Sequence, residues 1–155
     1  MVSIIDCDFS NREHREAIIE LMNDYMADKM GGNRPPYNDK TAQKVLTGLE
    51  KHPSKLVLLA KYDDRFVGLA NCFINFGTFA GRPFINIHDI VVLKSFRGRQ
   101  VGLRLMESIS HRAQELDCSK ITLEVRDDNT YAQKLYKKLG YREDKPPMHF
   151  WTKYL

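Results

Sequence analysis

Apolar side chains recur at helical spacing in four segments of the chain. The first predicted helix runs from about residue 11 towards residue 30, and Ser10 with Glu13 has the residue types of a capping box at its start. The sequence GGNRPPYND at 31–39 cannot continue this helix and reads as a loop. Three further helices are predicted at 41–51, 101–117 and 129–139. Gly140 follows the last of them, where a left-handed backbone often ends a helix.

Shorter apolar runs, some alternating with polar residues, predict five strands. They are 55–62, 65–76, 84–93, 120–126 and 148–155. Asp63 and Asp64 read as the turn of a hairpin between the first two strands. Two helices, three strands and then helix, strand, helix and strand predict an α/β (α+β) fold. We expect a mixed, mostly antiparallel sheet flanked by helices, in a single domain spanning 1–155.

The central part of this order is a β-α-β unit, in which parallel strands 84–93 and 120–126 should be joined by a right-handed crossover. Between the first strand and the helix lies Arg97-Gly98-Arg99-Gln100-Val101-Gly102, which contains no acid. A helix start presents free N–H groups and partial positive charge, and small residues let an anion approach them. The two arginines can fork onto phosphate oxygens. The segment therefore predicts a site for a phosphate-bearing ligand.

Composition limits the possible classes of function. The chain is 43% hydrophobic and 28% charged, which is typical of a soluble globular protein, and its longest apolar runs are too short to span a bilayer. Cys7, Cys72 and Cys118 are odd in number and lack metal-ligand spacing, which favours reduced thiols in a cytoplasmic protein without a metal site. Basic residues are dispersed outside the phosphate loop, so we expect neither a nucleic-acid nor a membrane partner.

Two motifs resemble the GNAT superfamily of N-acetyltransferases. RGRQVG at 97–102 is similar to the family's Q/R-x-x-G-x-G/A motif, which holds the pyrophosphate of acetyl-CoA, but Gln100 stands where the first glycine normally lies. DDNTYAQKLYKKLGYRE at 127–143 resembles the family's N-x-x-A-x-x-x-Y-x-x-x-G-[FY] segment. Both motifs follow in the family's order on elements of the expected type. The resemblance covers residue 56 to the end, whereas 1–55 match only as two helices.

The resemblance implies that acetyl-CoA is the cosubstrate. We expect its pyrophosphate against the amides from about Arg99 to Leu103 and its adenosine end near Arg97, while the family's pantetheine arm lies along the preceding strand. The implied cofactor-binding residues are Val91, Val92, Arg97, Arg99, Gln100, Val101, Gly102, Leu103, Asn129 and Tyr136. Asn129 also has the residue type of a helix N-cap.

The resemblance also assigns catalytic roles. The tyrosine corresponding to Tyr136 lies near the acetyl-CoA sulfur in the family and often protonates the departing thiolate; its place on an apolar helical stripe equally suits a core aromatic. For the general base, HDIVVLKSFRG is similar to the ED pair of spermidine/spermine N-acetyltransferases, with His88 in the glutamate's place. Strand alternation would send His88 and Asp89 to opposite faces unless a bulge intervenes, as is common in the family. A structural hydrogen-bonding role is the alternative for either residue.

The sequence thus favours an enzyme that moves an acetyl group from acetyl-CoA to a primary amine of a small molecule by direct attack. The acceptor could be a polyamine, an aminoglycoside or an amino-acid-like compound, with 28–39 and 75–83 lining its pocket. The alternatives are a peptide or protein N-acetyltransferase and a non-catalytic acyl-CoA-binding regulatory module. The aromatic strand 148–155 predicts a homodimer.

Overall fold

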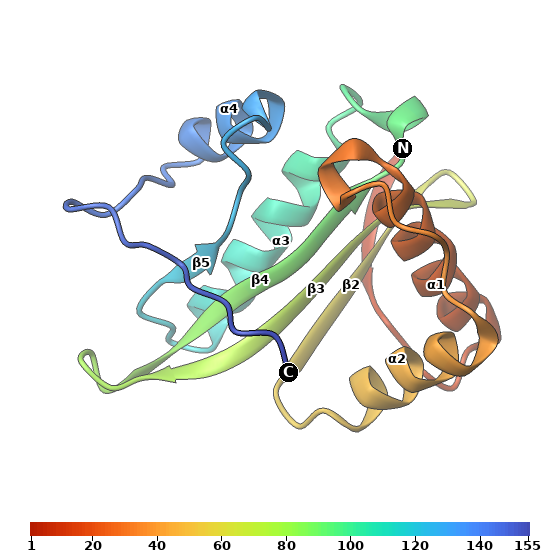
Figure 1. Ribbon diagram of the computed structural model, residues 1–155, viewed down its shortest axis with the longest axis horizontal. Coiled ribbons are helices and arrows are strands. Elements are labelled where there is room, and N and C mark those ends of the chain that lie inside the picture. Colours follow the sequence, from red (N-terminus) through yellow and green to blue (C-terminus); the bar gives the residue numbers. More distant parts are fainter. The chain divides into compact units, whose positions relative to one another are not determined.

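The computed structural model describes all residues from 1 to 155. Five strands form one sheet in the order β1-β2-β3-β4-β5 (Figure 1). They are β1 (Val2–Asp6), β2 (Lys55–Tyr62), β3 (Arg65–Gly77), β4 (Arg82–Val92) and β5 (Ile121–Leu123). Neighbours from β1 to β4 are antiparallel, and β4 and β5 are parallel. This mixed, mostly antiparallel sheet confirms the predicted fold class and its central β-α-β unit.

Both ends of the chain differ from the strand prediction. The sequence analysis missed β1, which pairs with β2 from Val2 opposite Tyr62 to Asp6 opposite Leu58. This five-residue strand is too short to show a clear alternation of apolar and polar residues. It is a strand because its backbone pairs with β2, not because of its own residue pattern. The predicted strand 148–155 is wrong, because these residues form no ladder and are exposed. Alternating side chains give a strand only where a neighbour takes up the backbone N–H and C=O groups.

The four predicted helices are present, with small shifts at their ends. They are α1 (Arg12–Ala27), α2 (Asp39–Lys51), α3 (Val101–Glu115) and α4 (Thr130–Lys138), with short 3-10 turns η1 (Lys29–Gly31) and η2 (Lys94–Phe96). The predicted capping box at Ser10 is wrong. Asn11 caps α1, since its side-chain oxygen accepts the Glu13 backbone N–H at 2.8 Å, whereas Ser10 bonds to the carboxylate of Asp8.

Helices α1 and α3 cover opposite faces of the sheet (Figure 1). On β3, Gly68 faces α3 so closely that a Cβ there would lie 3.0 Å from Val101 Cγ1 and 3.1 Å from Leu105 Cδ1. Three residues further along β3, Asn71 contacts Met22 of α1. Val101 and Leu105 are fully buried, so the start of α3 is fixed on the sheet through its apolar side chains.

The chain consists of two compact units, 1–124 and 125–155. The first contains the whole sheet with α1, α2 and α3, and the second contains α4 and the C-terminal residues. The single-domain organisation stays a prediction. None of the helices combines the length and the apolar character that crossing a membrane requires.

Candidate functional site

A β-bulge in β4 brings two of the predicted catalytic side chains together. Asp89 lies opposite Asn71 and Ile87 opposite Cys72, so His88 is an extra residue without a partner on β3. The bulge cancels one step of the strand's alternation. As a result, His88 Nδ1 lies 3.5 Å from an Asp89 carboxylate oxygen, at ion-pair distance. The expected bulge is confirmed.

The two members of this pair have different surroundings. The His88 side chain is 65% exposed, and its ring meets the edge of Phe73 with centroids 5.7 Å apart. The Asp89 side chain is only 20% exposed and accepts a hydrogen bond from Asn71 Nδ2 at 3.0 Å. Burial raises the pKa of Tyr37, and the negative charge of Asp89 raises it further. His88 can therefore exchange protons with solvent, whereas Asp89 is a largely enclosed anion.

Strand β4 has an open edge beyond the bulge. It pairs with β5 only at 85–87, opposite 121–123. The Leu93 N–H donates to the Val67 carbonyl oxygen of β3 at 2.9 Å. Because backbone N–H and C=O groups alternate in direction along a strand, those of Val91 also point to β3, and those of Val92 point to the open edge. The side chain of Val91 is buried. The Val92 C=O accepts from Arg97 Nε, so the Val92 N–H is the backbone donor available where an extended ligand could lie beside the strand.

The predicted phosphate loop has a backbone suited to an anion. Gly98 and Gln100 both have positive φ, at 77° and 65°, and Gln100 is the N-cap of α3 but makes no side-chain cap hydrogen bond. The first amides of α3, at Val101, Gly102 and Leu103, therefore have no side-chain cap, and its first turn contains no acid. Gln100 thus takes the left-handed conformation that glycine adopts freely, at a cost of about 1 kcal/mol.

Arg97 connects the loop to two other elements. Its Nε donates to the Val92 carbonyl oxygen at 3.2 Å, and its Nη2 lies 3.4 Å from an Asp28 carboxylate oxygen. The Met30 backbone N–H and the charge of Arg97 lower the pKa of the Asp28 carboxyl. Arg97 therefore joins the end of β4 to the turn after α1, and it is not a freely solvated charge.

Arg99 lies against aromatic rings. Its guanidinium is 5.3 Å from the ring centroid of Phe96 and 5.5 Å from that of Tyr62. Arg65 approaches the Phe96 ring at 5.5 Å. These contacts place the Arg99 cation on the β2–β3 side of the loop, and no acidic side chain pairs with it.

The three cysteines are poor nucleophiles. Burial, with a contribution from Asp89, raises the pKa of Cys72 to about 12, and burial and Asp8 raise that of Cys7 to about 11. Burial also raises the pKa of Cys118. Since the thiolate is the reactive form, none of these thiols is activated.

The remaining predicted site residues lie in the second unit. The Asn129 side-chain oxygen accepts the Ala132 backbone N–H at 3.2 Å, so its predicted role as the N-cap of α4 is confirmed. Tyr136 is 8% exposed, and its ring centroid is 6.0 Å from that of Tyr141. Its burial fits the core aromatic alternative and leaves the catalytic role a prediction.

Sequence reasoning missed Asn71, and it included Tyr37 and Asp28 only as members of the 28–39 segment predicted to line the acceptor pocket. Asn71 carried a signal, because it is a lone polar residue inside the apolar run of β3 and is 3% exposed. Its significance depends on the register with β4, which the sequence does not give. Tyr37 and Asp28 are ordinary loop and turn residues in the sequence, and only the fold brings them to Asp89 and Arg97.

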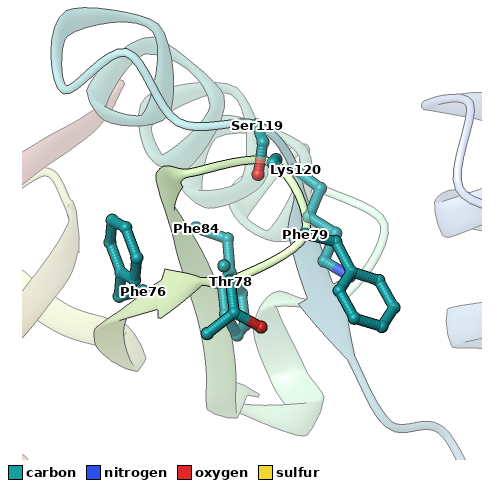
Figure 2. Close-up of a pocket in the computed structure, with 8 residues that line it drawn as sticks. Phe76, Thr78, Phe79, Phe84, Ser119 and Lys120 are labelled. Carbon is teal, nitrogen blue, oxygen red and sulfur yellow. The ribbon is translucent and has the colours of Figure 1, made fainter.

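The loop 75–83, predicted to line an acceptor pocket, lies at the start of β4, whereas Asp89 is near its end. Arg82 and Asp89 pair with Gly77 and Asn71, six steps apart on β3, so at about 3.3 Å per residue the two lie roughly 20 Å apart. The loop instead lines a separate, open pocket of about 420 Å³. Figure 2 shows the side chains that line it. Its lining includes Phe76, Thr78, Phe79, Phe84, Ser119 and Lys120. Within the first unit, the structure therefore does not bring this loop to the His88–Asp89 pair.

Comparison with known proteins agrees with this geometry. The thialysine N-epsilon-acetyltransferase of Bos taurus is 32% identical over 77 residues, 50% of this chain and 45% of that protein. The glucosamine 6-phosphate N-acetyltransferase of Candida albicans is 38% identical over 58 residues, 37% of each protein. The matches thus span half or less of these curated relatives. An aminoglycoside acetyltransferase from an uncultured soil metagenomic sample shares the fold, with a TM-score of 0.79 at 16% identity, covering 99% of this chain and 97% of that one.

The profile of the acetyltransferase (GNAT) family matches residues 16–141, which include the bulge, the phosphate loop and α4. The chain belongs to this acetyltransferase family.

Proposed function

We propose that the protein transfers an acetyl group from acetyl-CoA to the primary amine of a small molecule. The observation that carries this proposal is the bulge, which sets His88 and Asp89 beside the open edge of β4, in the strand that precedes an uncapped helix start. The relatives named above act, by their names, on thialysine and on glucosamine 6-phosphate, which are small amines. A polyamine, an aminoglycoside or an amino-acid-like compound fits the same description.

Acetyl-CoA would be held by the first unit's loop and strand. The amides from Arg99 to Leu103 suit its pyrophosphate, since they are not capped by side chains and the helix dipole favours an anion there. Val91 and Val92 are the β4 residues along which the pantetheine arm would lie. The adenosine end would lie near Arg97. The family resemblance extends the cofactor-binding set to Asn129 and Tyr136.

On its way from ammonium to amide the acceptor nitrogen loses two protons, and the departing thiolate gains one. His88 would take a proton from the acceptor ammonium and pass it to solvent. The neutral amine would attack the thioester carbonyl carbon, while the Val92 N–H polarises the carbonyl oxygen. When the C–S bond breaks, Tyr136 would donate its hydroxyl proton to the thiolate. The second proton lost by the nitrogen would pass to solvent, and solvent would return a proton to the Tyr136 oxygen. The protonated cysteines support direct transfer without an acetyl-enzyme.

Release of free CoA in the presence of different amines tests this function. We expect acetyl-CoA and a panel of diamines, aminoglycosides, amino sugars and lysine analogues to give CoA and the acetylated amine in equal amounts. Two-substrate kinetics should show intersecting lines. Acetyl-CoA binding without turnover would favour a regulatory module, turnover with peptides alone would favour a peptide N-acetyltransferase, and ping-pong kinetics would contradict direct transfer.

Replacing Gly102 by valine is expected to weaken acetyl-CoA binding at least about tenfold, because a branched side chain obstructs approach to the first amides of α3. Calorimetry at two salt concentrations measures this, and the wild-type affinity should fall as salt rises. Gly48→Val is the control, since Gly48 also lies within a helix, α2, with open space around its Cα. Equal affinities of Gly102→Val and wild type would contradict the proposed cofactor site.

We further propose a cytoplasmic homodimer. The three cysteines are free, which suits a reducing compartment. The exposed aromatic segment 148–155 includes Phe150, Trp151 and Tyr154, and such a surface tends to be covered. Light scattering should give twice the chain mass of 18.0 kDa. A monomer mass that does not change with concentration would refute the dimer.

A further inference from the structure

Asp28 is the only acid that forms an ion pair with an arginine of the proposed phosphate loop, 97–102. Its carboxylate lies 3.4 Å from Arg97 Nη2, although the two residues are 69 positions apart in the chain. Arg99, the other arginine of the loop, lies against aromatic rings instead. A site for a phosphate-bearing ligand gains affinity from cations, and an acid beside one of them reduces that gain. Asp28 is therefore placed where it opposes binding of the anion.

The turn that follows α1 holds this carboxylate in place independently of Arg97. One carboxylate oxygen of Asp28 accepts the Met30 backbone N–H at 2.8 Å, and the other faces Arg97. The Asp28 backbone carbonyl oxygen accepts the N–H groups of Gly31 at 3.0 Å and Asn33 at 3.1 Å, which closes the turn. The Met30 N–H contributes most to lowering the pKa of Asp28, and the charge of Arg97 contributes less. The carboxylate is therefore ionised at neutral pH and fixed beside the loop.

Arg97 keeps N–H donors for a ligand while it makes these contacts. A guanidinium has five N–H donors, and Arg97 uses Nε for the Val92 carbonyl oxygen and Nη2 for Asp28. Its side chain is 37% exposed, so the remaining N–H groups can meet a phosphate oxygen that approaches from solvent. The 3.4 Å contact with Asp28 is longer than a typical charge-assisted hydrogen bond. A bound phosphate and Asp28 would therefore share one cation.

We infer that Asp28 is a positioning residue that acts through Arg97 and weakens the binding of acetyl-CoA and of CoA. This inference rests on the proposed function and concerns its cofactor site. Asp28 and the pyrophosphate are both anions, so they compete for the charge of one guanidinium. Acetyl-CoA and the product CoA carry the same pyrophosphate, so Asp28 weakens the binding of both by the same factor. The weaker binding of CoA lets the product leave after each turnover.

Asp28→Asn tests the role of the charge, because asparagine keeps an oxygen for the Met30 N–H and is an equally good helix cap. We expect calorimetry to give a Kd for acetyl-CoA about fivefold lower than that of wild type, the upper end for one partly exposed charge pair. The Kd for CoA should fall by the same factor, and inhibition by product CoA should become stronger to match. Asp28→Ser, which also suits a helix cap, replaces this variant if it does not fold.

A double-mutant cycle shows whether the gain in affinity depends on Arg97. Arg97→Gln alone should weaken acetyl-CoA binding about threefold, since it removes a cation that Asp28 already neutralises in part. Adding Asp28→Asn to Arg97→Gln should improve the affinity by less than about twofold. In Asp28→Asn alone the affinity should fall more steeply with salt than in wild type, because Arg97 then acts as a full cation. A fivefold gain that persists without Arg97 would overturn the assignment.

Asp24→Asn is the matched control, because it removes the same charge one turn earlier on α1, from an exposed side chain that makes no ion pair. Its Kd for acetyl-CoA should stay within about twofold of wild type. If the Asp28 variant binds acetyl-CoA as wild type does, or more weakly, Asp28 only anchors Arg97, and the inference is overturned while the proposed function stands. If wild type does not bind acetyl-CoA, the proposed function itself fails.

Discussion

Replacing Tyr136 by phenylalanine is expected to lower kcat about 100-fold, the low end of general acid–base effects. The thiolate that leaves acetyl-CoA gains from a positioned O–H, and phenylalanine removes only that group. Because Tyr136 is 8% exposed in its unit, retaining the ring should preserve packing, and affinity for acetyl-CoA should change much less. Steady-state kinetics by detection of free CoA, with calorimetry of acetyl-CoA binding, measures both quantities.

Tyr141→Phe is the matched control for this experiment. Its ring lies 6.0 Å from that of Tyr136, and the substitution removes the same hydroxyl from the same unit. We expect kcat of this variant to stay within a few-fold of wild type. If Tyr136→Phe keeps full activity on the true acceptor, Tyr136 is a core residue and the thiolate leaves without its help.

The second large effect is expected at His88. An imidazole accepts a proton only in its neutral form, so kcat/KM should fall as the pH is lowered. His88→Ala should lower kcat/KM about 100-fold at high pH and remove or shift this acidic limb. A pH series from 5 to 9 on both proteins, with saturating acetyl-CoA, measures the change.

His52→Ala serves as its control, because His52 also packs on Phe73, with ring centroids 4.6 Å apart. It bonds locally to the Ser54 N–H at 3.2 Å and makes no contact with Asp89. The control should keep both the rate and the acidic limb. An unchanged acidic limb in His88→Ala would instead assign proton removal to Asp89 or to a carboxylate acting through water.

The sequence was most informative where a period or a motif is long. The apolar face of α3 and the hairpin of β2 and β3 were predicted correctly because many residues in each follow the spacing of one buried face. The proposed phosphate loop was singled out because two arginines and two glycines at a helix start, without an acid, favour an anion. Gln100 has a left-handed backbone, which local residue preference alone would not predict.

What the sequence did not reveal depends on contacts between distant segments. Strand β1 exists because β2 pairs with it, and 148–155 lacks such a partner. Asn71 and Asp89 are 18 positions apart, and only the register of β3 on β4 makes them neighbours. Asp28 and Arg97 are 69 positions apart. No local pattern encodes such pairs.

Because of the extra residue at position 88, odd- and even-numbered side chains of β4 exchange faces of the sheet between the part before it and the part after it. Side chains 86, 89 and 91 share one face of the sheet, whereas uninterrupted alternation would have grouped 86 with 88, 90 and 92. A sequence alignment that matches this strand to an unbulged strand without a gap therefore pairs residues of one face of the sheet with residues of the other. Deleting this single residue would instead restore regular alternation and leave 86, 89 and 91 on their present face, so a one-codon change would remove the bulge and the His88 side chain while keeping the register of both halves of the strand.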